Sequence, residues 1–129
     1  MITNTPLMLT LVILAAYLLG AIPNGLLIAK CKGIDLRQSG SGNIGATNVF
    51  RCVGKGWGVF AFILDAVKGF VPAFFFPRLM AGGPDWLGLA CGVAAVAGHN
   101  WPVWLGFKGG KGVSTSAGML LGIAPAAVG

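Results

Sequence analysis

Four apolar runs constrain the fold of this chain more than any other feature. They cover residues 6–29, 57–80, 86–105 and 113–129, and each is close to the ~20 residues that a helix needs to cross a bilayer. Only 9% of the residues are charged, far below the roughly 25% of an ordinary soluble domain. We therefore predict an all-α fold, a polytopic transmembrane helical bundle with about four spanning helices in one integral membrane domain, residues 1–129.

Basic residues predict how these helices are oriented. Five lie between the first and second runs, two lie between the third and fourth, and only Arg78 lies between the second and third. Because cytoplasmic loops are enriched in Lys and Arg, we expect loops at about residues 30–56 and 106–112 to face the cytoplasm and the N-terminus to lie outside. The net charge is +6, but most basic residues flank apolar runs and therefore report membrane topology, so we expect no nucleic-acid partner.

Two polar, glycine-rich stretches fall on this same side. SGSGNIGATNVFR covers residues 39–51, and GHNWPVWLGFKGGKGVSTSAG covers residues 98–118. Glycine lets the backbone approach a ligand closely, and successive N–H groups, hydroxyls and amides can donate hydrogen bonds to an anion. With Arg51, Lys108 and Lys111, the stretches predict a phosphate-binding site. The alternative is that each stretch only connects two helices.

The glycine-lysine segment does not match the P-loop of nucleotide-binding proteins. That motif requires G-x-x-x-x-G-K-[ST] after a strand. Counting back from Gly110 and Lys111, Leu105 stands where the first glycine is needed, and Gly112 follows the lysine. We therefore expect no bound nucleotide.

Asp65 and Lys68 lie inside the second apolar run, three residues apart on one face of the predicted helix. At this spacing the two side chains can pair with each other. Each charge costs ~2.5–3.5 kcal/mol at the centre of a spanning helix, so the pair should be buried in the bundle or displaced toward one end. We interpret it as structural rather than catalytic.

Other residue types limit the chemistry. His99 is the only histidine, and no aspartate follows it five residues later as in one acyltransferase pattern, because Trp104 stands there. A lone histidine is more often a satisfied hydrogen-bonding group than a base, and its role is left open between orienting a phosphate, assisting proton transfer and holding the loop. The three cysteines form no C-x-x-C motif, so we expect no metal site and no cofactor.

A site of hydroxyls, amides, backbone donors and cations, without paired carboxylates, suits a reaction with a good leaving group. Phosphate leaves readily from an acyl phosphate, and cationic donors stabilise the charge that develops. An acceptor with its own phosphate could take up the hydroxyl proton itself. The protein would then mainly hold two phosphorylated molecules in line.

Three stretches carry a resemblance to a known family: GSGNIGATNVFR, LDAVKG and GHNWPVWLGFKGGKGVSTSAG. They closely resemble the bacterial membrane acyl-phosphate:glycerol-3-phosphate acyltransferases, the PlsY family, and the resemblance extends over essentially all 129 residues. It implies transfer of a fatty acyl group from acyl phosphate to the 1-hydroxyl of glycerol 3-phosphate, giving lysophosphatidic acid and phosphate in the first step of phospholipid synthesis. It also implies the bacterial cytoplasmic (inner) membrane as the location, and the two substrates and the lipid bilayer as partners.

The resemblance further implies residue roles. The residues expected to be catalytic are Ser41, His99 and Asn100. The residues expected to bind substrate or phosphate are Asn43, Thr47, Asn48, Arg51, Lys108, Gly109, Gly110, Lys111, Gly112 and Thr115. Ser114 stands where many family members have alanine.

Family members have seven spanning helices and a third cytoplasmic motif, whereas this sequence carries about four helices and two of the three motifs. We therefore expect the functional protein to continue beyond Gly129, and residues 1–129 alone to be inactive or poorly folded. Two other functions stay open. One is a small membrane anion channel or phosphate transporter, although we find no inverted repeat of the kind typical of transporters. The other is a non-catalytic assembly subunit, which would tolerate alanine at Ser41, Arg51 and Lys111.

Overall fold

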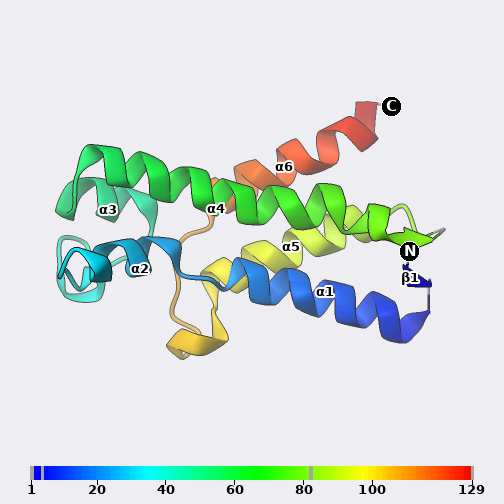
Figure 1. Ribbon diagram of the computed structural model, residues 1–129, viewed down its shortest axis with the longest axis horizontal. Helices are drawn as coiled ribbons and strands as arrows, with labels where there is room; N and C mark the ends of the chain where they lie inside the picture. The colour runs from blue at the N-terminus through cyan, green and yellow to red at the C-terminus, as the bar shows by residue number, and fades with distance from the viewer. Residues whose placement is uncertain (1, 4, 82, 129) are drawn as a thin grey trace.

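The computed structural model describes residues 2–3, 5–81 and 83–128, and its helices follow the apolar runs (Figure 1). The helices are α1 (Pro6–Gly20), α2 (Asn24–Cys31), α3 (Ala46–Cys52), α4 (Lys55–Phe75), α5 (Leu87–Asn100) and α6 (Val113–Val128), with short 3-10 turns η1 (Leu36–Gln38), η2 (Pro77–Leu79) and η3 (Val103–Leu105). The predicted all-α class is confirmed. Its one small departure in the described ranges is a parallel pairing of two-residue strands, β1 (Ile2–Thr3) with β2 (Met80–Ala81).

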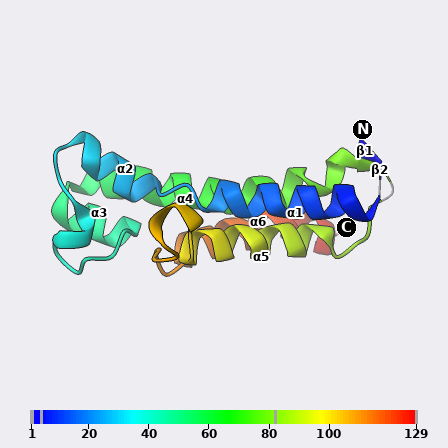
Figure 2. The ribbon, with the colours of Figure 1, turned by 90° about the horizontal axis from the view of Figure 1, so that it is seen from below.

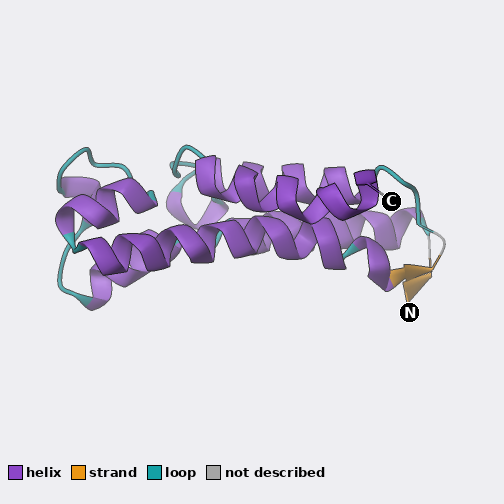
Figure 3. Ribbon diagram, turned by 90° about the horizontal axis from the view of Figure 1, so that it is seen from above, coloured by secondary structure: helices purple, strands orange, loops and turns teal. Residues whose placement is uncertain are grey.

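Four helices lie side by side along the long axis of the molecule. Helices α1 and α5 run from the end that holds the chain termini toward the opposite end, and α4 and α6 run back (Figures 1 and 2). Helix α4 packs against both α5 and α6, and α1 packs against α5. The shorter helices α2 and α3 and the loops beside them gather at the end away from the termini, as Figure 3 also shows. The polar stretches therefore lie toward one end of the bundle.

The outward faces of the long helices are apolar. Leu7, Leu11 and Leu14 on α1, together with residues 59, 63 and 67 on α4, are 47% to 64% exposed. The segments Pro6–Cys31 and Lys55–Leu79 contain 18-residue stretches with mean hydropathies of 2.1 and 1.9 and are long enough to cross a bilayer. Helices with apolar residues on their outer as well as their inner faces are typical of membrane bundles. The fold is that of a transmembrane helical bundle, as predicted.

Close packing between these helices depends on small residues. A Cβ atom at Gly20 would overlap backbone atoms of Ala95 on α5, and one at Gly118 would overlap the backbone of Ala66 on α4. Small residues at such positions let two helix backbones approach each other, and they are enriched at contacts between transmembrane helices.

The first apolar run, expected to cross as one helix over residues 6–29, is divided into α1 and α2. Residues 21–23 separate the two helices. Pro23 has no N–H and its ring would clash with the carbonyl four residues earlier in a continuous helix, so the chain bends here. Similarly, α5 ends at Asn100, although the third run continues to residue 105. Pro102 disfavours helical geometry at the residue before it, Trp101.

The predicted pairing of Asp65 with Lys68 is confirmed. Lys68 Nζ lies 3.2 Å from Asp65 Oδ1, and the two side chains are 4% and 1% exposed. We expected the pair to be either buried in the bundle or displaced toward one end, and the structure shows it buried.

Candidate active site

Residues 39–45 form a compact turn that exposes several polar groups. Gly40 and Gly42 have φ angles of 54° and 76°, in the left-handed region that glycine adopts without strain. Two side chains then bond to backbone N–H groups two residues ahead: the Ser41 hydroxyl accepts from Asn43 at 3.3 Å, and Asn43 Oδ1 accepts from Gly45 at 2.8 Å. These local bonds fix Ser41 and Asn43 just before α3 begins.

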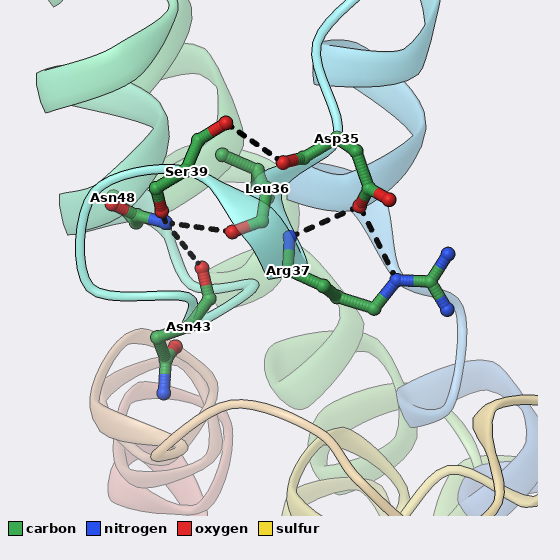
Figure 4. Close-up of polar contacts among 6 residues, drawn as sticks. All are labelled: Asp35, Leu36, Arg37, Ser39, Asn43 and Asn48. Atoms are coloured by element: carbon green, nitrogen blue, oxygen red, sulfur yellow. Dashed lines mark hydrogen bonds and ion pairs between the residues drawn. The ribbon is translucent and has the colours of Figure 1, made fainter.

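Asn48, on the first turn of α3, holds this turn in place from inside (Figure 4). Its Nδ2 donates to the carbonyls of Leu36, Ser39 and Asn43 at 3.2, 3.0 and 2.8 Å. Its Oδ1 accepts from the Ser41 N–H at 3.2 Å, and the residue is only 2% exposed. The amide of Asn48 is thus engaged with the protein on both of its polar atoms.

The second polar stretch is fastened to the C-terminal end of α5. The N–H of Gly109 donates to the Asn100 carbonyl at 3.0 Å, and that of Gly110 donates to the His99 carbonyl at 3.1 Å. Carbonyls at a helix C-terminus have no partner within the helix, and here the loop supplies one. A Cβ atom at Gly110 would lie 2.5 Å from Nε2 of His99, so only glycine lets the loop pass this close to the imidazole.

The two stretches meet at one pocket of about 260 Å³. Its walls come from the turn before α3, from α3, from one side chain of α4, from the end of α5 and from the start of α6. The lining residues are Ser41, Asn43, Gly45, Ala46, Thr47, Asn48, Arg51, Phe62, His99, Lys111, Gly112, Val113 and Ser114. The structure therefore brings together eight residues predicted for the site: Ser41, Asn43, Thr47, Asn48, Arg51, His99, Lys111 and Gly112.

The other five predicted residues lie near the pocket without lining it. Gly109 and Gly110 contact the end of α5, and Lys108 is exposed. Thr115 is fully buried, and its backbone faces Gly69 on α4. Asn100 lies beside Gly112, and its Oδ1 and the Thr115 Oγ1 are buried without a hydrogen-bond partner among the described residues.

Sequence reasoning missed five lining residues: Gly45, Ala46, Phe62, Val113 and Ser114. Four of them fall inside the two polar stretches: Ala46, Val113 and Ser114 adjoin predicted residues, and Gly45 lies two residues from Asn43. Phe62 is different because it lies in the middle of an apolar run. Only the packing of α4 beside α3 reveals it.

The pocket carries positive charge and hydrogen-bond donors. Arg51 and Lys111 both line it, as do Val113 and Ser114 in the first turn of α6. N–H groups in the first turn of a helix have no acceptor within the helix, and the helix dipole there favours an anion. No carboxylate is among the described lining residues, and the imidazole of His99 is the one side chain there that can both donate and accept a proton through ring nitrogens. This arrangement is suited to holding a phosphate.

A second, apolar groove of about 250 Å³ adjoins the polar pocket. Ala46, Thr47 and Phe62 line both of them. The rest of the groove is formed by Phe50, Gly58 and Val59, and its two large side chains are 45% and 53% exposed. The site thus offers a charged compartment beside an apolar one that opens on the outer face of α4.

Comparison with known proteins gives a consistent result. The family model described as glycerol-3-phosphate acyltransferase matches residues 10–129. A glycerol-3-phosphate acyltransferase of Geobacter metallireducens is 52% identical over 119 residues, which are 92% of this chain and 60% of that protein. One of Aquifex aeolicus is 50% identical over 113 residues, 88% of this chain and 58% of that protein. The chain therefore spans less than two thirds of the length of these relatives.

Solved structures resemble the fold as well. The crystal structure of PlsY, an integral membrane glycerol 3-phosphate acyltransferase, in its glycerol 3-phosphate form superimposes with a TM-score of 0.82 at 47% identity, covering 92% of this chain and 58% of that one. The lysophosphatidic acid form of PlsY gives a TM-score of 0.81 at 46% identity, with the same coverage.

Proposed function

Because the chain belongs to the glycerol-3-phosphate acyltransferase family, we propose that it transfers a fatty acyl group from acyl phosphate to the 1-hydroxyl of glycerol 3-phosphate. The products are lysophosphatidic acid and phosphate. One observation supports this proposal above the others: a polar pocket of about 260 Å³ with two cations shares three lining residues with an apolar groove. A soluble phosphorylated alcohol and a lipid-borne acyl group would meet at that junction.

Glycerol 3-phosphate would bind in the polar pocket. Its phosphate would lie between Arg51 and Lys111, with the N–H groups that begin α6 as further donors. The planar guanidinium of Arg51 can bind two phosphate oxygens at once, whereas Lys111 acts as a point charge. The side chains of Ser41, Asn43 and Thr47 would hold the glycerol hydroxyls.

The acyl phosphate would place its chain in the apolar groove. Phe50 and Val59 line this groove and are half exposed on the side that faces lipid, so a chain could enter from the bilayer. Thr47 and Phe62 would then lie at the reacting carbonyl, where groove and pocket join.

The reaction itself needs few protein groups. The 1-hydroxyl oxygen forms a bond to the acyl carbonyl carbon, and the bond from that carbon to the phosphate oxygen breaks with its electrons leaving on phosphate. The hydroxyl proton passes to a phosphate oxygen, directly or through His99. Cations and hydrogen-bond donors fixed around the departing phosphate lower the barrier because they stabilise charge as it develops.

The other predicted residues have supporting places in this proposal. Asn48 would hold Ser41 and Asn43 in position, because its own amide is bonded within the turn. Gly109 and Gly110 would fasten the loop that carries Lys111 to the end of α5. Asn100 and Thr115 each have a buried oxygen without a described hydrogen-bond partner, and substrate, water or further residues would supply that partner.

The activity can be tested by phosphate release from palmitoyl phosphate, with and without glycerol 3-phosphate, in membranes that hold the protein. Two forms should be compared: residues 1–129 alone, and residues 1–129 completed with the C-terminal part of the Geobacter metallireducens relative. We expect release that depends on glycerol 3-phosphate from the completed form and little or none from residues 1–129. Phosphate uptake without acyl transfer would favour a transporter instead.

Site variants sharpen this test. Ser41→Ala should lower turnover. Arg51→Ala or Lys111→Ala should each weaken the binding of glycerol 3-phosphate by about 1.5–3 kcal/mol, because a charge-assisted hydrogen bond is lost. Lys55→Ala is the matched control, because Lys55 is an exposed cation near the same end that does not line the pocket. Unchanged kinetics in all three site variants would remove these residues from the site.

The chain is membrane-embedded, and we further propose its orientation. The spans at about residues 6–29, 57–80, 86–105 and 113–129 would cross the bacterial inner membrane with the N-terminus outside and the pocket facing the cytoplasm. Cys31, exposed at the end of α2, offers a direct test with a membrane-impermeant maleimide. Cys31 should react in inverted vesicles and be protected in intact cells. The variant Asp85→Cys, made in a Cys31→Ser background, should react in intact cells and be protected in inverted vesicles, because Asp85 is exposed between the second and third spans.

A further inference from the structure

The break between α1 and α2 is held by a buried polar cluster that the reaction does not use. Lys68 Nζ donates to the Ile22 carbonyl at 2.9 Å, and Asn24 Nδ2 donates to Asp65 Oδ1 at 3.2 Å. Lys68 also pairs with Asp65 at 3.2 Å. One residue pair on α4 thus binds the chain on both sides of Pro23, where the helical hydrogen bonds are interrupted.

The segment on one side of the break supports the turn that carries Ser41 and Asn43. Gly25, in the first turn of α2, faces the Ile44 carbonyl so closely that a Cβ atom would lie 2.5 Å from it. Leu26 and Ala29 belong to the same buried cluster as Ile44 and Val49. A change in the direction of α2 would therefore move the backbone beside Asn43.

The segment on the other side of the break touches the element that carries His99. A Cβ atom at Gly98 of α5 would lie 2.7 Å from the N–H nitrogen of Ala21, the residue just before Ile22. The Tyr17 hydroxyl donates to the Trp101 carbonyl at 2.6 Å. The break therefore lies between the two elements that bring Ser41 and His99 to one pocket.

We propose that Asp65 and Lys68 are positioning residues of the pocket: by fixing the α1–α2 break, they set the placement of the turn at residues 39–45 relative to the end of α5. Neither of them lines the pocket. The ion pair has two separable properties. Its charges compensate each other, and its two hydrogen bonds hold the broken backbone.

Three variants separate these properties. Lys68→Met removes the bond to Ile22 and leaves the Asp65 charge without its partner, and Asp65→Asn removes the opposite charge while keeping an acceptor for Asn24. The double variant Asp65→Asn/Lys68→Met is neutral, so it should regain the thermal stability that either single variant loses, because an apolar replacement of a buried pair is tolerated better than a single unpaired charge. It still cannot donate to the Ile22 carbonyl.

Amide hydrogen exchange followed by mass spectrometry tests the proposal without reference to activity. Both variants with methionine at position 68 should speed exchange in residues 24–31 and 36–45 by about tenfold to hundredfold, as expected for loss of a hydrogen bond to a charged group. Gly88→Ala is the control. Its Cβ atom would lie 2.9 Å from the Ala73 carbonyl, which perturbs α5 at the end far from His99. It should leave exchange in residues 36–45 unchanged.

A kinetic arm rests on the proposed function. In the completed form described above, the double variant should raise the KM for glycerol 3-phosphate by about tenfold to hundredfold, since displacements of about 1 Å in a site have effects of that size. If the parent protein transfers no acyl group, the proposed function fails, and the exchange experiment alone decides on positioning. Unchanged exchange in residues 36–45 overturns the proposal, and so does faster exchange with an unchanged KM in an active enzyme.

Discussion

Helices α4 and α6 are joined by small residues, whereas the turn at residues 39–45 is held by side-chain hydrogen bonds, most of them made by the amide of Asn48. Between the helices, Gly69 and Gly118 let two backbones touch. In the turn, Asn48 alone binds three carbonyls and one N–H group. The first kind of contact tolerates no added volume, and the second tolerates no lost hydrogen bond.

This difference follows from what surrounds each region. Helices satisfy their own backbone, so a membrane bundle needs only close packing between them. A turn has free carbonyls, and the carbonyl of Leu36 is one of those that lie where water does not reach easily, since Leu36 is fully buried. Such groups need an internal partner, because a buried polar group without one is costly. The bundle and the turn should therefore fail separately when each is perturbed.

The largest expected effect tests the bundle. Gly118→Val should destabilise the protein by about 3 kcal/mol or more, because its side chain would collide with the backbone of Ala66, which cannot move aside. The measurement is the folded fraction in detergent by size exclusion and thermal unfolding. Gly56→Val is the control, since Gly56 on α4 has no neighbouring atom within 4 Å of its Cβ position. Equal losses in both variants would mean that helix propensity, and not packing, decides.

The next effect tests the turn. Asn48→Ala should cost about 1–3 kcal/mol, confined to residues 36–45, because it removes three side-chain hydrogen bonds to carbonyls and leaves those of Leu36 and Ser39 with a backbone N–H donor only. Trypsin should then cut faster after Arg37 while the helices stay intact. Ser39→Ala serves as control, since it removes only the bond from the Ser39 hydroxyl to the Asp35 carbonyl. Loss of the whole fold in Asn48→Ala would contradict a separation between turn and bundle.

A smaller effect on stability is expected where the second loop meets α5. Gly110→Ala would bring a methyl group 2.5 Å from Nε2 of His99, and the loop or the imidazole must shift. We expect a loss of about 1 kcal/mol in stability and a clear drop in acyl transfer by the completed form. Gly106→Ala is a useful comparison because its Cβ position is open, although its φ of 63° is unfavourable for alanine. Normal transfer in Gly110→Ala would show that His99 has room to move.

The smallest effect is expected at the surface. Arg37 Nε lies 3.3 Å from Asp35 Oδ1, with side chains 57% and 43% exposed. Exposed ion pairs contribute about 0–1 kcal/mol and weaken with salt. Arg37→Gln should therefore leave unfolding in detergent nearly unchanged. A loss as large as that of Asn48→Ala would mean that the turn depends on charge as well as on its buried amide.

Much of the fold was predictable from the sequence, because apolar runs report helices directly. Where the runs misled, the reason was local: Pro23 and Pro102 each stop a helix inside an apolar stretch, and hydropathy does not register them. The close packing of Gly69 and Gly118 was not predictable, since a glycine in an apolar run gives no indication of which helix faces it.

The pocket was predictable as two motifs but not as a geometry. Cations beside the glycine-rich stretches predicted that Arg51 and Lys111 bind phosphate, which stays a prediction, and the structure brings both to one pocket. Spacing could not distinguish glycines that admit a ligand from Gly109 and Gly110, which admit the end of α5. Nor could spacing distinguish an asparagine whose amide is free to bind substrate from Asn48, whose amide is hydrogen-bonded within the turn.

The long sequence distances across the α1–α2 break have a consequence for synthesis. Chains emerge from the ribosome N-terminus first, yet the Ile22 carbonyl finds its donor 46 residues later in Lys68, and the Tyr17 hydroxyl finds its acceptor 84 residues later in Trp101. The hydrogen bonds that fix the α1–α2 break therefore cannot form until α4 and then α5 have been inserted, and until then the polar groups at the break lack these partners. The order of insertion makes the N-terminal helices the first to enter the membrane and among the last to reach their final structure.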